Sequence, residues 1–218
     1  ADGIYNSSGD KNITIVHGSI FVNGNGESRS GDWSSGISNI SNTNTTTLSG
    51  SIKATGDYLA GIYNEGDDNK TTVSGSITTD GTEAYGISNA GNNNTTSISG
   101  TVKATGTRSA ALFNWLGSGN SFTLNEGATI IGNILAREAP GSVTTNSKLI
   151  FNLGASTSYA YSVSGEGEGT GDGQWIFSDL DRSSQVVTTT GTGCDTTITS
   201  AGNDTCNLVT AVGAANAE

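Results

Sequence analysis

The residues best suited to chemistry in this sequence are carboxylates that lie in short polar segments. Two suitably spaced acidic groups are enough to cleave a glycosidic bond, one acting as an acid and the other as a base or nucleophile. The candidates are Asp57, Glu65, Asp67, Asp68, Asp80 and Glu83. Related segments of the chain read "ISNTN" and "GNNN" at the positions of Glu65 to Asp68, so the acids occupy variable turns. We therefore favour solvated loop charge over catalysis.

Other catalytic and metal sites have weaker signals. The single histidine, His17, lies in the strand-like "ITIVHGSI" with no nucleophile elbow near it, so we do not predict a Ser-His-Asp triad. The segment "SGEGEGTGDGQW" offers Glu166, Glu168 and Asp172 to Ca²⁺, but it lacks the calcium-binding nonapeptide repeat and is interpreted as a turn. With one His and no C-x-x-C pair, we predict neither a metal nor a cofactor.

Two cysteines stand near the end of the chain. Cys194 and Cys206 are separated by a Ser-, Gly- and Asn-containing segment, "GCDTTITSAGNDTC". This spacing favours a disulfide that closes a surface loop in an oxidising compartment, and two free thiols are the alternative.

The composition narrows both the fold and the partners. Of 218 residues, 33% are hydrophobic and 13% are charged, and 32 are Gly. Disordered chains of such polarity usually carry many charges, whereas Thr, Asn, Ser and Gly without charge indicate turn-rich β structure. The net charge of -11 argues against a nucleic-acid partner, because phosphate binding requires clustered Lys and Arg. No run of 18 apolar residues is present, so no membrane-spanning helix is expected.

A 25-residue repeat is the strongest signal. One apolar and one Asn column return at that step: Ile37, Ile62, Ile87 and Leu112, and Asn39, Asn64, Asn89 and Asn114. Further columns keep the same step: Gly50, Gly75 and Gly100; Leu48, Val73 and Ile98; Asn44, Asn69 and Asn94. An earlier, irregular copy contains Ile4, Asn6, Asn12, Gly18 and Ile20.

Each copy holds three short runs with period-two alternation, as in "GIYN", "KTTV" and "GSIT", separated by turn residues. A unit this small buries little by itself and must stack on its neighbours. The sequence therefore predicts an all-β parallel β-helix with three short strands per turn of about 25 residues. The aliphatic columns should point inward, and the Asn column should form an internal ladder.

The repeated form "AYGISNAGNNNTTSISGTV", followed by "NSFTLNEGATIIGNI" at 120–134, resembles the passenger of a bacterial autotransporter of the pertactin-like or adhesin-like kind. The resemblance covers residues 1–180 and implies a right-handed parallel β-helix that is exported to the cell surface or secreted. Residues 147–177 resemble the C-terminal region of such passengers, which helps folding proceed during export. The signal peptide and membrane barrel of the family's full pattern are missing, so we expect a passenger or part of one.

We expect regular repeats over 1–119, and an irregular continuation with the C-terminal passenger region and a tail over 120–218. The predicted function is non-enzymatic adhesion or self-association at the outer membrane surface or after secretion. Its partners would be a host-surface protein or glycan, or another copy of the chain. The candidate binding residues are Tyr58, Tyr63, Tyr85 and Phe113, which we expect to protrude and to serve as anchors.

Two alternatives remain open. A β-helical polysaccharide hydrolase or lyase would use carboxylates on adjacent turns. A hydroxyl face that binds ice or a glycan would use the Thr rows, namely Thr45 to Thr47, Thr71, Thr72, Thr95 and Thr96.

Overall fold

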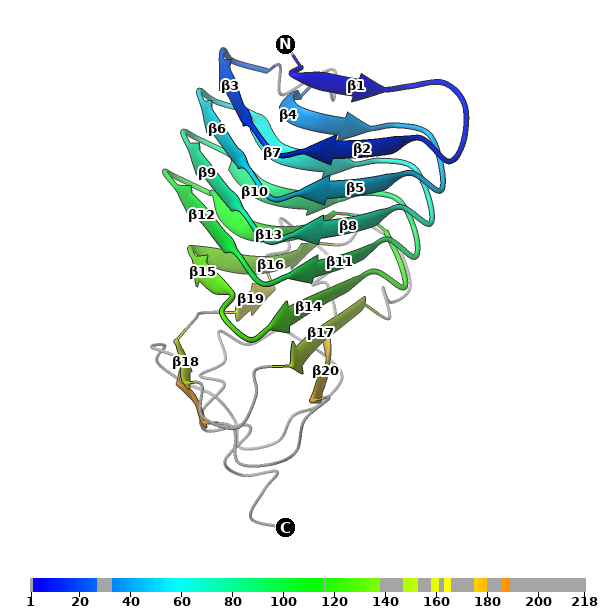
Figure 1. The fold of residues 1–218 in the computed structure, drawn as a ribbon. Helices are drawn as coiled ribbons and strands as arrows, with labels where there is room; N and C mark the ends of the chain where they lie inside the picture. The colour runs from blue at the N-terminus through cyan, green and yellow to red at the C-terminus, as the bar shows by residue number, and fades with distance from the viewer. Residues whose placement is uncertain are drawn as a thin grey trace.

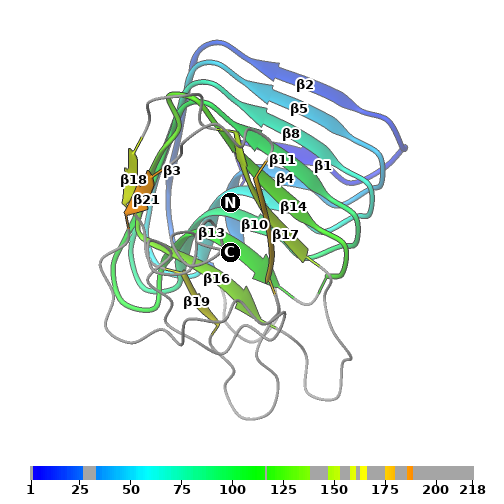
Figure 2. The same cartoon turned by 90° about the horizontal axis from the view of Figure 1, so that it is seen from below.

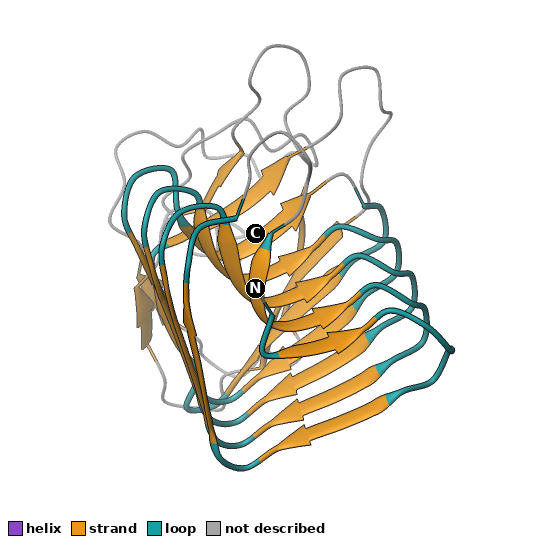
Figure 3. Ribbon diagram, turned by 90° about the horizontal axis from the view of Figure 1, so that it is seen from above, coloured by secondary structure: helices purple, strands orange, loops and turns teal. Residues whose placement is uncertain are grey.

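The structure is a computed structural model that describes residues 2–26, 33–115, 117–137 and 147–152, and the backbone of strands within 158–188. The described chain winds into a parallel β-solenoid (Figure 1). Each turn of the solenoid is called a rung below, and each of the first five rungs contributes one strand to each of three sheets. Viewed along the axis, the three sheets enclose a common interior (Figures 2 and 3).

The strands of the first three rungs are β1 (Ile4–Asn6), β2 (Ile13–Val16) and β3 (Ser19–Asn23); β4 (Ser34–Asn39), β5 (Thr45–Leu48) and β6 (Ser51–Thr55); β7 (Leu59–Asn64), β8 (Lys70–Val73) and β9 (Ser76–Asp80). The next two rungs are β10 (Ala84–Asn89), β11 (Thr95–Ile98) and β12 (Thr101–Thr105); β13 (Ala110–Trp115), β14 (Ser121–Asn125) and β15 (Thr129–Ile131). They are followed by β16 (Asn133–Arg137), β17 (Ser147–Asn152), β18 (Ser158–Ala160), β19 (Val163–Gly165), β20 (Trp175–Asp179) and β21 (Val186–Thr188).

The sheets follow the rung order. Sheet A runs β1-β4-β7-β10-β13-β16-β19, sheet B runs β2-β5-β8-β11-β14-β17-β20, and sheet C runs β3-β6-β9-β12-β15. Strands β18 and β21 pair separately. In sheet A, Ile62 lies opposite Ile37 on one side and Ile87 on the other, which is the register of the 25-residue repeat. The predicted all-β class, with three parallel strands per turn of about 25 residues, is confirmed.

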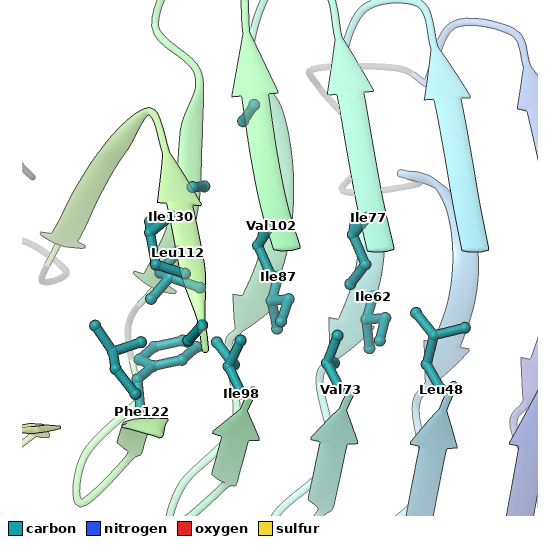
Figure 4. Packing of buried hydrophobic residues seen from close by; sticks show 14 of the residues in the cluster. Leu48, Ile62, Val73, Ile77, Ile87, Ile98, Val102, Leu112, Phe122 and Ile130 are labelled. Atoms are coloured by element: carbon teal, nitrogen blue, oxygen red, sulfur yellow. The ribbon is translucent and has the colours of Figure 1, made fainter. Parts of the chain in front are cut away.

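The core is a set of aliphatic columns inside the solenoid (Figure 4). Side chains alternate along strands of sheets B and C, so that every second residue is buried. The fully buried residues include Ile37, Leu48, Ile52, Ile62, Val73, Ile77, Ile87, Ile98, Val102 and Leu112. Because each rung buries only a few side chains, the free energy of burial comes from contacts between neighbouring rungs.

Gly75 shows why glycine recurs at one corner of the first four rungs, at Gly18, Gly50, Gly75 and Gly100. A Cβ placed on Gly75 would meet the carbonyl oxygen of Gly50 in the preceding rung, within less than an allowed contact distance. Gly100 stands in the same relation to Gly75. This corner between sheets B and C therefore requires a residue without a side chain so that the backbones can approach.

The solenoid continues past the predicted boundary at residue 120. Strand β14 pairs with β11, and β17 pairs with β14, in sheet B. The step between rungs lengthens to 26 residues from Asn94 to Asn120, and a bulge lies between Ala110 and Leu112 where β13 pairs with β16. The irregularity seen in the sequence is thus a change of rung length within continuous sheets.

Candidate functional site

The Asn column forms a hydrogen-bonded ladder from Asn6 to Asn89 on the inner side of sheet A. Nδ2 of Asn6 donates to Oδ1 of Asn39 at 2.7 Å, Asn39 donates to Asn64 at 2.7 Å, and Asn64 donates to Asn89 at 2.8 Å. The Nδ2 atoms of four Asn residues also donate to a Thr hydroxyl of the same rung: Asn6 to Thr14, Asn39 to Thr46, Asn64 to Thr71 and Asn89 to Thr96. The amide groups are thereby occupied by each other and by Thr.

The pattern changes at Asn114. In the register of sheet B, Phe122 lies opposite Thr96, so an aromatic ring takes the place of the hydroxyl. Asn114 accepts a hydrogen bond from Nδ2 of Asn120 and donates to the Ser147 hydroxyl at 2.8 Å. A new set of partners therefore replaces the Thr contact where the repeat becomes irregular.

The carboxylates of Asp57 and Asp67 each accept a hydrogen bond from the next rung. Oδ1 of Asp67 accepts from the backbone N–H of Asn92 at 2.7 Å, and Oδ1 of Asp57 accepts from that of Thr82 at 2.7 Å. In the preceding rung Asn42 Oδ1 plays the same part toward the N–H of Asp67, at 2.8 Å. These acids therefore serve as corner caps, a role that Asn fills equally well elsewhere.

Two further candidate acids also have partners. Oδ1 of Asp80 accepts from the Thr105 hydroxyl at 2.8 Å. Glu83 forms an ion pair with Arg108, with 3.2 Å between Oε1 and a guanidinium nitrogen. Both contacts again join consecutive rungs.

Glu65 and Asp68 lie at the corner between sheets A and B. Asp68 has a left-handed backbone with φ of 57°, and its N–H donates to the Asn92 carbonyl.

Burial, and secondarily the negative charge of Glu65, raise the pKa of Tyr63 above its ordinary value.

The predicted aromatic anchors Tyr63, Tyr85 and Phe113 do not protrude into solvent. Their side chains leave the outer face of sheet A, yet all three are buried in a second hydrophobic cluster. Trp33 stacks on Tyr63, Tyr85 and Trp115 with ring centroids 5.5, 4.9 and 5.3 Å apart, and Tyr85 stacks on Phe113 at 4.3 Å. The expectation of exposed anchors is wrong for these three residues, because Trp33 stacks on Tyr63 and Tyr85, and Tyr85 stacks on Phe113.

Tyr58 lies at a different place, at the corner between sheets C and A. Its side chain is half-buried and its backbone is left-handed, with φ of 55°. It follows that the four predicted anchors do not form one surface.

His17 is exposed at the corner between β2 and β3. Its Nδ1 lies 2.6 Å from the Ser49 hydroxyl of the next rung, a neighbour that sequence reasoning missed. The pair is exposed, and the backbone N–H of Ser49 is bonded to the Val16 carbonyl as in the other rungs. Lining up the corner positions of successive copies would have placed these two residues together.

The Thr rows divide between the two faces of sheet B. Thr46, Thr71 and Thr96 point inward to the Asn ladder. The outward row contains Thr47, Thr72, Ser97 and Thr123, which lie opposite one another on β5, β8, β11 and β14. Neighbouring strands in a sheet are about 4.8 Å apart, so this outer face carries evenly spaced hydroxyl groups.

The first rung has a different outer surface. It carries large apolar side chains that face outward, with exposed fractions of 57% for Tyr5, 74% for Ile13, 59% for Ile15 and 75% for Phe21. The corresponding residues of the second rung are Ser38, Thr45, Thr47 and Lys53. The sequence did not reveal this apolar surface, because the repeat was recognised from residue types that its copies share, and these four residues differ from those of the next copy.

Some predictions concern residues outside those described. The Cys194–Cys206 disulfide and the calcium candidates Glu166, Glu168 and Asp172 are among them. Within the part of the chain that the structure describes, no cluster of three or more His, Cys, Asp or Glu residues is arranged to hold a metal ion. The same part contains no helix of the length and apolar character needed to cross a membrane.

Comparisons with protein families, with curated proteins and with solved structures give no match for this chain.

Proposed function

We propose that this chain is a non-enzymatic passenger of the autotransporter kind, acting in adhesion or self-association at a bacterial cell surface or after secretion. The observation that carries the proposal is the outer hydroxyl row of sheet B. Thr47, Thr72, Ser97 and Thr123 lie in register over four consecutive strands. Hydroxyl groups donate and accept hydrogen bonds, so a regular row can bind the same row of another copy or the hydroxyls of a glycan.

The partners of the carboxylates support a role without catalysis. Asp57 and Asp67 accept backbone N–H groups, Asp80 accepts a hydroxyl, and Glu83 is paired with Arg108. A catalytic acid or base must instead be free to exchange a proton with a bound substrate.

The proposal is tested by displaying the chain on cells that do not clump and measuring their sedimentation and their binding to glycan arrays. Replacing Thr47 and Thr72 by Val removes two hydroxyls of the row and keeps the branched shape. We expect this double variant to lose clumping or glycan binding. The matched control, Thr78→Val, lies on the outer face of sheet C and should bind as the parent does.

A polysaccharide hydrolase or lyase is the competing function. Reducing ends or unsaturated products released from a polysaccharide panel by the purified chain would overturn the proposal. The proposal would also be overturned if cells that display the chain showed no clumping and no binding to any glycan or host surface.

A further inference from the structure

The outer face of sheet B carries a second row of residues beside the outer hydroxyl row. This second row lies two residues earlier on the same strands, and it continues onto β17. In the order of the strands its members are Thr45, Lys70, Thr95, Ser121 and Lys148. Figure 1 shows strands β5, β8, β11, β14 and β17 one below another. The two rows together are called the sheet B face below.

Hydroxyl groups make up most of the sheet B face. Of its nine members all but Lys70 and Lys148 are Thr or Ser, and all nine are exposed or half-buried. Neighbouring strands are about 4.8 Å apart, and alternate residues of one strand are about 6.6 Å apart. Groups that donate and accept hydrogen bonds at such regular intervals suit a ligand that itself carries many hydroxyls.

The sheet B face is positive in a strongly negative protein. The chain contains 20 Asp and Glu against 9 Lys and Arg, yet the strands of sheet B from β2 to β17 contain neither Asp nor Glu. Lys70 and Lys148 are exposed, and neither forms an ion pair within the described part of the chain. The local charge of this face therefore favours a ligand with anionic groups.

The spacing of the two lysines indicates how densely such a ligand is charged. Lys70 and Lys148 lie on β8 and β17, which are three strands apart, so their backbones are separated by about 14 Å. Two ammonium groups at that distance fit a chain in which uncharged units separate the charged ones. Nucleic acids carry a phosphate on every nucleotide and are bound by clustered Lys and Arg, so this spacing does not suit them.

The sheet B face lacks the anchors of a protein interface. The centres of such interfaces are enriched in aromatic residues, Met and Arg, and none of the nine members belongs to these types. Two copies of this chain that met through this face would also bring like charges together. A polyhydroxylated anion therefore fits the face better than a protein partner does.

We propose that the sheet B face binds an acidic polysaccharide, in which uncharged sugars separate those that carry a carboxylate or sulfate. This inference rests on the glycan-binding form of the proposed function and specifies its ligand class and its site. Lys70 and Lys148 bind the anionic groups through charge-assisted hydrogen bonds, and the Thr and Ser hydroxyls between them bind the sugar hydroxyls. The polysaccharide thus runs along the solenoid axis and crosses the strands.

The test is binding of the purified 218-residue chain to two immobilised polysaccharides that carry both charged and uncharged sugars, hyaluronan and partly methyl-esterified pectin. Their matched neutral forms are carboxyl-reduced hyaluronan and fully methyl-esterified pectin. We expect the chain to bind at least one of the acidic forms, with an affinity at least tenfold higher than for its neutral form. Added salt should weaken this binding by screening the two lysines.

Paired glutamine variants locate the site. Lys70→Gln combined with Lys148→Gln should weaken binding to the acidic polysaccharide about tenfold, because it removes both charged contacts. The control, Lys53→Gln combined with Lys103→Gln, removes the same charge from the outer face of sheet C and should bind as the parent does.

Chemical labelling locates the site without any substitution, so it also covers a variant that fails to fold. The parent chain is acetylated with and without saturating acidic polysaccharide, and each lysine is followed by mass spectrometry. Bound polysaccharide should slow the acetylation of Lys70 and Lys148 severalfold and leave that of Lys53 and Lys103 unchanged.

The inference would be overturned by no binding to either acidic polysaccharide, by equal binding to the acidic and neutral forms, by equal losses in the two glutamine variants, or by no protection of Lys70 and Lys148. These outcomes differ from failure of the proposed function. Displayed cells that clump, or that bind neutral glycans alone, would retain the proposed function and reject the acidic ligand.

Discussion

Asn64 and Asn89 are joined inside the solenoid by a hydrogen bond of 2.8 Å from Nδ2 to Oδ1, and both side chains are fully buried. The residues are one rung apart, so the bond ties adjacent strands of sheet A through side chains as well as through backbone. A buried amide without a partner is costly, and the column is therefore stable only when every member is present.

Asn64→Ala should destabilise the solenoid by about 2–5 kcal/mol, because it leaves Nδ2 of Asn39 and Oδ1 of Asn89 each without one partner, at about 1–3 kcal/mol per group, and opens a small cavity. Urea unfolding followed by circular dichroism measures the change. Asn6→Ala is the matched control at a half-buried member of the ladder, where water can replace the lost contact. Equal losses for the two variants would contradict a ladder role.

Gly75→Ala should destabilise the protein by about 1–3 kcal/mol, because the new methyl group meets the backbone of Gly50 and Ser49, which cannot move without separating the rungs. Gly18→Ala is the control in the same column, since an added Cβ there would have no neighbour within 4 Å. Thermal unfolding of both variants checks the prediction. A destabilised Gly18 variant would show that the cause is backbone conformation and not contact.

The repeat made the fold predictable from the sequence alone. Ile37, Ile62 and Ile87 share a step and a place in the alternation, and stacking of identical units converts that step directly into sheet register. The positions of Tyr63 and Tyr85 relative to solvent were not predictable in this way. Their cover comes from Trp33, which precedes the second rung and belongs to no column of the repeat.

The exposed apolar side chains of the first rung were hidden for a different reason. In "ITIV", Ile13 and Ile15 lie on one face of the strand, and Thr14 and Val16 lie on the other. Apolar residues are therefore present on both faces, and alternation alone does not tell which face points outward. Only the alignment of Asn12 with Asn44 sets Ile13 opposite Thr45 and reveals the exchange of an apolar for a polar outer face.

Alkaline titration tests the environment of Tyr63. Because burial raises its pKa, folded Tyr63 keeps its proton when an unfolded tyrosine loses it near pH 10. The contribution of neutral, buried Tyr63 to the free energy of unfolding is therefore fully present below about pH 10. It declines above that pH by at most about 1.4 kcal/mol per pH unit. Unfolding free energies between pH 8 and 11 should fall less steeply for Tyr63→Phe than for the parent chain.

Two further variants separate the causes of that shift. Glu65→Gln removes the smaller cause and should lower the pKa of Tyr63 only slightly. Trp33→Ala uncovers the ring and should lower it more. If Glu65→Gln has the larger effect in ultraviolet titration, charge and not burial controls this tyrosine.

Asp67 decides between a capping and a catalytic role for the loop acids. Its Oδ1 accepts the backbone N–H of Asn92, and the Asn42 side chain does the same for the N–H of Asp67 itself. Asp67→Asn should therefore fold with a stability within about 0.5 kcal/mol of the parent, since the amide oxygen accepts the same bond. Asp67→Ala loses the acceptor and should cost about 1 kcal/mol. Chemical denaturation measures both values, and polysaccharide turnover is measured on the same samples. If Asp67 were a catalytic carboxylate, Asp67→Asn would abolish turnover without loss of stability, because Asn preserves the cap but cannot carry a proton. Loss of turnover in a fully stable Asp67→Asn protein would therefore assign Asp67 to chemistry.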